Sequence, residues 1–67
     1  MDYKRAMKAC SRGEYIREAA MPKQWYIYHV KATGEFVLVT AFDNRYEFEP
    51  TEYQLQSNEW SIIDPRS

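Results

Sequence analysis

One imidazole and one thiol are available for nucleophilic or acid–base chemistry in this chain, at His29 and Cys10. A general base needs an orienting acid and a nucleophile within hydrogen-bond reach. His29 lies in the middle of a β-rich run, between Tyr28 and Val30, which is typical of a hydrogen-bonded sheet histidine. Cys10 falls on the apolar stripe of a segment with helical spacing, where a thiol behaves as a small buried hydrophobe. The sequence therefore predicts a protein that is not an enzyme.

Metal and phosphate motifs are the next candidates for chemistry. One cysteine and one histidine do not make a zinc set. The acids between residues 43 and 52 lack the alternating ligands around a central glycine that an EF-hand loop needs. With Gly13 and Gly34 as the only glycines, the chain contains neither a P-loop nor a dinucleotide fingerprint. We predict no metal site and no cofactor.

Aromatic faces and scattered cations are the binding chemistry that remains. Aromatic residues make up 16% of the chain, and each base that stacks on such a ring gains roughly 1–3 kcal/mol. The rings able to stack a base are those of Trp25, Tyr26, Tyr28, Tyr46, Tyr53 and Trp60. The cations able to pair with phosphate oxygens are those of Arg12, Arg17, Lys23 and Arg45. Because core packing claims most aromatic residues in so small a protein, we expect about two or three of the six to touch a ligand.

A β-hairpin over Gln24 to Phe42 is the element that must organise these side chains. Two runs of period-two alternation flank the turn at residues 31–34, where Gly34 suits a positive φ. The second arm places Phe36, Leu38, Thr40 and Phe42 on one face. Both faces of the ribbon are apolar or aromatic, so the sheet needs two covers.

The flanking segments predict one cover and three further strands. Asp2 can cap a helix that ends at Arg12 or Gly13, with an apolar stripe for one sheet face. Short strands are expected over residues 14–18, 46–49 and 59–63. Thr51 and Gln54 match a capping box, which predicts a short helix to about Ser57 with Tyr53 or Leu55 facing inward. The expected fold class is α+β: an N-terminal helix packed on a small antiparallel sheet of about four to five strands, with a short helix before the last strand.

Length and charge limit the remaining possibilities. The 67 residues predict a single domain over residues 1–67, and a lone cysteine fits a reducing, cytoplasmic location. The sequence contains no apolar run long enough to span a membrane. Residues 1–33 carry a net charge of +4 and residues 34–67 carry −5, which gives −1 overall and argues against a nucleic-acid polymer as partner. So small an aromatic domain predicts a homo-oligomer, with a compact monomer as the alternative.

The order of signals resembles small phage proteins of the second Thoeris anti-defence family. The opening is similar in residues 3–10, followed by Gly13, Ile16 and Arg17. The closing is similar in Pro50, Thr51, Leu55 and residues 58–63. Members of that family bind nucleotide-derived immune second messengers, such as cyclic ADP-ribose isomers and cyclic dinucleotides, between subunits and without cleaving them.

The resemblance implies a sponge that sequesters such a messenger in the cytoplasm of an infected bacterium. By position, Arg17 would hold phosphate, Trp25 would stack, and Asn58, Glu59 and Trp60 would shape the pocket. Together with the stacking faces and cations above, the candidate ligand-binding residues are Arg17, Lys23, Trp25, Tyr28, Arg45, Asn58, Glu59 and Trp60.

Two other functions are compatible with the residues. A small inhibitor could dock on a host protein through its hairpin or an edge strand, and the acidic second half would suit a basic target. A nucleic-acid accessory protein using the first helix is disfavoured because that helix is short and the overall charge is not positive.

Overall fold

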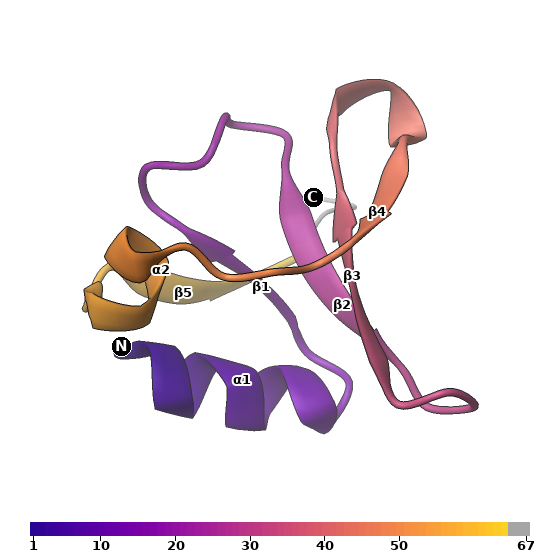
Figure 1. Cartoon of the computed structure of the whole chain (residues 1–67), viewed down its shortest axis with the longest axis horizontal. Coiled ribbons are helices and arrows are strands. Elements are labelled where there is room, and N and C mark those ends of the chain that lie inside the picture. Colours follow the sequence, from indigo (N-terminus) through magenta and orange to yellow (C-terminus); the bar gives the residue numbers. More distant parts are fainter. Residues whose placement is uncertain (65–67) are drawn as a thin grey trace.

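The computed structural model describes residues 1–64 as a five-stranded antiparallel sheet in the order β4-β3-β2-β1-β5, with helix α1 against one face (Figure 1). The elements in chain order are α1 (Tyr3–Ser11), β1 (Tyr15–Glu18), β2 (Tyr26–Val30), β3 (Glu35–Val39), the 3₁₀ turn η1 (Ala41–Asp43), β4 (Arg45–Glu47), α2 (Glu52–Gln56) and β5 (Trp60–Ile63). A short helix precedes the last strand, so the expected α+β class and its element order are confirmed.

The central hairpin forms where it is predicted, with its turn between β2 and β3. Ile27 lies opposite Leu38, and Tyr28 lies opposite Val37, so the two arms present matched faces. Gly34 closes the turn with φ +77°. Glycine adopts this conformation without steric cost because it has no Cβ. The predicted extension of the second arm to Phe42 is wrong, because β3 ends at Val39 and the chain turns through η1.

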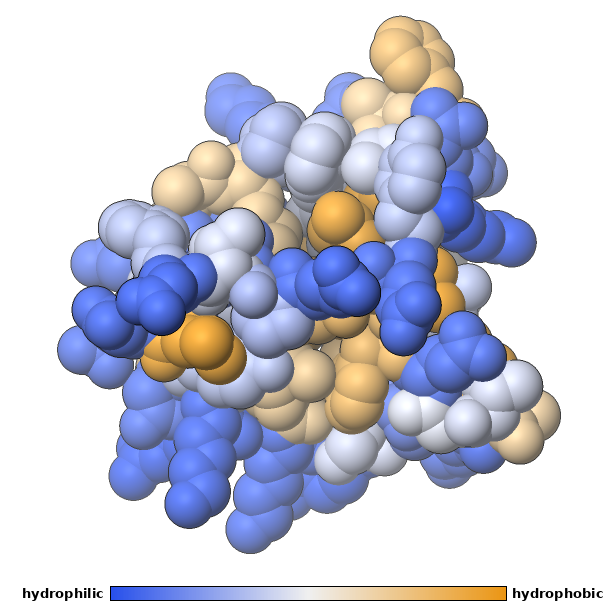
Figure 2. Space-filling view, in the orientation of Figure 1, coloured by the Kyte–Doolittle hydropathy of each residue, from blue (hydrophilic) through white to orange (hydrophobic). Residues whose placement is uncertain are grey.

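Helix α1 begins after the predicted cap and ends at Ser11, one residue before the predicted end at Arg12 or Gly13. The side chain of Asp2 accepts a hydrogen bond from the Arg5 backbone N–H at 2.8 Å, and Gly13 follows the helix with φ +105°. Ala6, Ala9 and Cys10 are buried against the sheet. The basic side chains of α1 are exposed on its outer side, which forms a hydrophilic edge of the molecule (Figure 2).

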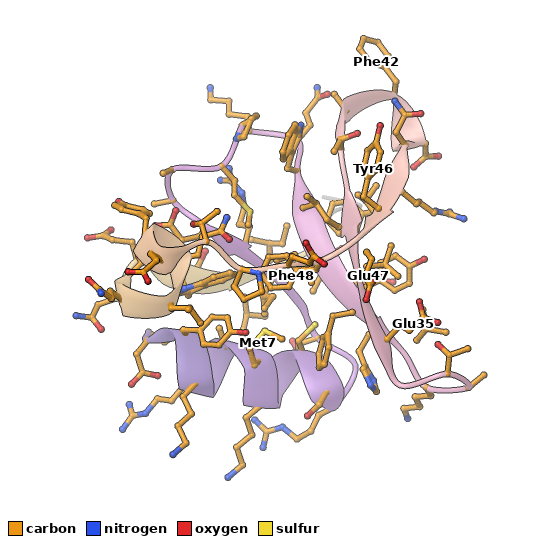
Figure 3. The ribbon with its side chains drawn as sticks, viewed as in Figure 1. Met7, Glu35, Phe42, Tyr46, Glu47 and Phe48 are labelled. Carbon is orange, nitrogen blue, oxygen red and sulfur yellow. The ribbon has the colours of Figure 1, made fainter. Side chains whose placement is uncertain are left out.

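The core lies between α1 and the sheet. Its buried members are Ala6, Cys10, Ile16, Met21, Ile27, Phe48 and Trp60. Trp60 is the centre of an aromatic cluster, with ring centroids 5.6 Å from Tyr3 and 6.2 Å from Phe48. Met7 packs against the same core, and its side chain and that of Phe48 occupy the space between helix and sheet (Figure 3).

Helix α2 has the predicted capping box but not the predicted inward face. Thr51 accepts from the Gln54 backbone N–H at 3.2 Å, and the Gln54 side chain accepts from the Thr51 N–H at 3.0 Å. Tyr53 and Leu55 remain 61% and 48% exposed, so the expectation that one of them faces inward is wrong. The space beneath the helix is already filled, because the Trp60 indole N–H donates to the Gln54 carbonyl at 3.0 Å.

The second face of the sheet has no helix over it within the described residues. The side chains on this open face include Tyr15, Tyr26, Tyr28, Val37, Val39 and Ile63. Tyr15 packs edge-on against Tyr26, with ring centroids 5.5 Å apart. The sequence predicts two covers for this sheet, and residues 1–64 supply one. No helix in residues 1–64 is long and apolar enough to cross a membrane.

Candidate functional site

Two pockets lie on either side of Tyr53, at the end of the molecule formed by α2, the β1–β2 loop and the turn before β5. The first, which we call the polar pocket, has a volume of about 340 Å³. It is lined by Tyr53, Gln56, Ser57, Asn58 and Glu59. The volume lies in the range of small-molecule sites, about 300–1,000 Å³.

The second, which we call the apolar pocket, has a volume of about 190 Å³. Its walls include Met21, Pro22, Trp25, Leu38 and Tyr53, and Glu18, Ala20, Thr51 and Gln54 complete the lining. This volume is below the usual range for a drug-sized ligand, so it fits one ring or one side chain. Tyr53 lines both pockets, so its phenol forms a shared wall.

The backbone of the turn before β5 fixes the polar pocket. The Glu59 N–H donates to the Ser57 hydroxyl at 3.0 Å, and the Glu59 carbonyl accepts from the Ala19 N–H at 3.0 Å. The Asn58 carbonyl accepts from the Met1 nitrogen at 3.2 Å. In residues 1–64 these bonds use main-chain groups of Asn58 and Glu59, and their exposed side chains make no hydrogen bond of their own. An amide and a carboxylate are therefore free to bind a ligand.

A buried carboxylate joins the two pockets. Glu18 is 1% exposed, and its two oxygens accept from the Ser57 hydroxyl at 2.7 Å and from the Ala20 N–H at 2.8 Å. Glu18 lines the apolar pocket, whereas Ser57 lines the polar one. Because burying a carboxylate is costly unless it is hydrogen-bonded, these two bonds tie the β1–β2 loop to the α2–β5 turn.

The predicted site residues fall in several places. Asn58 and Glu59 line the polar pocket, and Trp25 forms a wall of the apolar pocket. Trp60 is only 2% exposed in the core and lines neither of the two pockets. It supports α2 from below, through its bond to the Gln54 carbonyl.

The Arg17 side chain binds backbone carbonyls of its own chain and is not directed into either pocket. Its guanidinium donates to the Met21 carbonyl at 2.7 Å and to the Pro22 carbonyl at 3.0 Å, while its Nε is buried without a partner. A strand arginine next to the inward Ile16 is expected to be exposed, whereas the Arg17 side chain is half-buried. The arginine holds the β1–β2 loop in place, because charged donors make strong bonds to carbonyl oxygens.

The other predicted cations and the predicted tyrosine lie outside both pockets. Tyr28 is on the open sheet face, where its ring lies 6.3 Å from that of Tyr15. Arg45 begins the edge strand β4 and is exposed, and Lys23 is exposed in the loop beside Pro22. Among residues 1–64 of one subunit, the lining of the polar pocket therefore contains no cation.

Some pocket residues could have been found from sequence patterns. Period-two alternation in β1 places Glu18 on the face of buried Ile16, which indicates an inward carboxylate. Tyr53 is among the rings able to stack a base, but the sequence analysis also expects it to face inward, so it is not among the predicted site residues. Gln56 and Ser57 carry no distinguishing local signal.

The thiol of Cys10 and the imidazole of His29, the two groups most suited to catalysis, are packed inside the protein or against a neighbouring ring. Burial raises the pKa of the Cys10 thiol to about 11, and the thiol lies 3.7 Å from the Ile27 carbonyl. His29 packs against Phe36 with ring centroids 4.7 Å apart and an angle of 44° between the rings, and its Nδ1 is buried without a partner. The expectation of a hydrogen-bonded sheet histidine is therefore wrong within residues 1–64. In the part of the chain that is described, no group of three His, Cys, Asp or Glu residues is placed to hold a metal ion.

Comparison with known proteins adds no family to this picture. No family model matches the sequence, and no curated protein matches it closely enough to establish one.

Proposed function

We propose that the protein sequesters a nucleotide-derived second messenger, such as a cyclic ADP-ribose isomer or a cyclic dinucleotide, and returns it unchanged. In this proposal it acts as a phage immune-evasion protein in the cytoplasm of an infected bacterium. The polar pocket holds the messenger, and a second subunit completes the site. No bond of the ligand is made or broken.

The observation that carries the proposal is the meeting of Tyr53, Asn58 and Glu59 around one pocket of about 340 Å³. A nucleoside offers a flat base and several hydroxyl or amino donors. A phenol face can stack the base, while a carboxylate and an amide can bind the donors. The side chains of Asn58 and Glu59 are free for this role, because the turn that holds them uses backbone bonds.

The phosphates of such a messenger need cations that the lining of the polar pocket lacks. In this proposal they come from a second subunit, as expected for a site between subunits. Lys23 and Arg45 are exposed and are suited to this role. Arg17 is not, because its guanidinium is already bound to two carbonyls.

Two substitutions on the same turn test the pocket. Glu59→Gln should weaken binding of a captured messenger about tenfold or more, because a hydrogen bond to a charged acceptor contributes about 1.5–3 kcal/mol. Asn58→Ala should weaken it about two- to tenfold, because a hydrogen bond between neutral groups contributes about 0.5–1.5 kcal/mol. Isothermal titration calorimetry measures the affinity. Glu49→Gln, an exposed acid outside both pockets, is the matched control and should bind normally. Unchanged affinity in both pocket variants would remove the polar pocket from the site.

A second candidate function is inhibition of a host protein. The edge strand β4 favours it, because Arg45, Tyr46 and Glu47 are all exposed and one edge of the strand is unpaired in the described sheet. Such an edge can accept an added strand. The Phe48 N–H bonds to the Phe36 carbonyl of β3, and ladder bonds alternate along the strand, so the Glu47 N–H points to the free edge. Replacing Glu47 by Pro, which cannot donate, should abolish this docking and leave nucleotide capture intact.

A further inference from the structure

Phe42 is the most exposed large hydrophobic residue of the described chain. Its side chain is 96% exposed and projects from the turn between β3 and β4, away from the rest of the molecule (Figure 3). A phenyl ring that is exposed in its own chain buries no apolar surface there and adds nothing to the stability of the fold. Its burial against another surface would gain about 1.5–3 kcal/mol, which is a factor of about ten to a hundred in affinity.

The backbone beneath this ring is strained. Phe42 has φ +69° and ψ +20°, and Asp43 follows with φ +64°. A bulky residue in the left-handed region is an outlier, since Gly or Asn occupies it at lower cost. The turn nevertheless carries a phenylalanine. A strained backbone that holds an exposed aromatic ring is a reason to look for a binding role.

The apolar pocket of the same chain matches this ring in size and chemistry. Its volume of about 190 Å³ suits one aromatic side chain, and its walls include Met21, Pro22, Trp25 and Leu38. Trp25 offers an aromatic surface on which a phenyl ring can pack edge-on or offset.

The charges beside the ring and beside the pocket are complementary. Asp43 adjoins Phe42, and Arg45 follows two positions later. Lys23 adjoins the lining residue Pro22, and Glu52 lies between the lining residues Thr51 and Tyr53. All four charged side chains are exposed. Asp43 near the ring can face Lys23 near the pocket, and Arg45 near the ring can face Glu52 near the pocket. Opposite charges on two surfaces orient a docking contact.

We propose that Phe42 of one copy of the chain inserts into the apolar pocket of a second copy. The contact is made twice in a two-fold dimer, because each copy carries both the ring and the pocket. Tyr53 lines both pockets, so the docked copy also borders the polar pocket. It brings Arg45 to the rim of a site whose own lining has no cation. The dimer itself does not depend on nucleotide binding, so it can be tested without a ligand.

Sedimentation-velocity ultracentrifugation of the full chain, from micromolar to sub-millimolar concentration, measures the association. Phe42→Asn removes the ring and keeps a residue that tolerates positive φ, so the turn should survive. Ala20→Phe places a ring at the mouth of the chain's own apolar pocket and blocks it. Each variant should raise the dimer dissociation constant by about a hundredfold or more. The double variant should be little worse than either single variant, because both remove the same contact.

Leu55→Asn is the matched control, since Leu55 is exposed on α2 and lines neither pocket. It should associate like the unmodified protein. Circular dichroism and the melting temperature confirm that each variant is folded, and Phe42→Asn should not lower the melting temperature of the monomer. A monomeric unmodified protein, or a Phe42→Asn variant that dimerises normally, would overturn the proposal. A dimer that resists Ala20→Phe but not Phe42→Asn would also overturn it, because the ring would then dock elsewhere.

Discussion

The carboxylate of Glu18 accepts a hydrogen bond of 2.7 Å from the hydroxyl of Ser57, a residue 39 positions further along the chain. Both residues are buried. The bond joins the end of β1 to the turn that precedes β5, and it lies where the two pockets adjoin. This buried polar contact therefore helps to fix the shape of the candidate site.

Removing the Ser57 hydroxyl should destabilise the protein. Ser57→Ala leaves one Glu18 oxygen without its donor and the Glu59 N–H without its acceptor. The expected loss is about 2 kcal/mol in the free energy of unfolding, measured by urea denaturation, because a buried charged acceptor is left unsatisfied. Ser11→Ala, an exposed change on α1, is the control and should stay within about 0.5 kcal/mol. Equal effects in the two variants would contradict a structural role for the Glu18–Ser57 bond.

Removing the Arg17 guanidinium should loosen the β1–β2 loop and leave ligand affinity nearly unchanged. Arg17→Ala breaks the bonds to the Met21 and Pro22 carbonyls and should cost about 1–3 kcal/mol of stability. Hydrogen exchange of the amides in residues 19–25 should become faster. Arg12→Ala, an exposed arginine after α1, is the comparison and should change neither quantity. A large loss of ligand affinity in folded Arg17→Ala would restore this residue to the site.

The buried Cys10 thiol predicts a pH dependence of stability. Burial raises its pKa from 9.0 to about 11, so the folded state retains the thiol proton when the unfolded state has lost it. The contribution of the protonated thiol to the free energy of unfolding is fully present below pH 9. About 2–3 kcal/mol of it is lost as the pH rises through about 11. The difference in unfolding free energy between the unmodified protein and Cys10→Ala should shrink over that interval. A constant difference would contradict the raised pKa.

Local patterns predict the elements of this fold because each is specified by its own residues. The hairpin follows from period-two alternation and Gly34, and both helices begin at the caps Asp2 and Thr51. The end of β3 had no such signal. The alternation of Phe36 and Leu38 continues to Phe42, but the Thr40 N–H bonds to the Asn44 carbonyl at 2.9 Å, and this contact closes a turn in place of a longer strand.

The site was harder to predict because tertiary contacts decide which side chains are free. Arg17 and Trp60 are polar or aromatic groups of the right type, but a loop carbonyl and a helix carbonyl already bind them. Asn58 and Glu59 line the polar pocket, with their side chains free of hydrogen bonds within residues 1–64. Glu18 and Tyr53 complete the pair of pockets. Alternation in β1 indicates that Glu18 points inward, but no local motif specifies its bond to Ser57 or the exposed position of Tyr53 on α2.

Capture of an intact messenger is the central claim, and native mass spectrometry tests it most directly. The protein purified from cells is mixed with a panel of cyclic dinucleotides and cyclic ADP-ribose isomers. The account predicts an oligomer that gains the mass of one panel member and releases the same mass after denaturation. A protein that binds no member, or a ligand recovered with an altered mass, would contradict it.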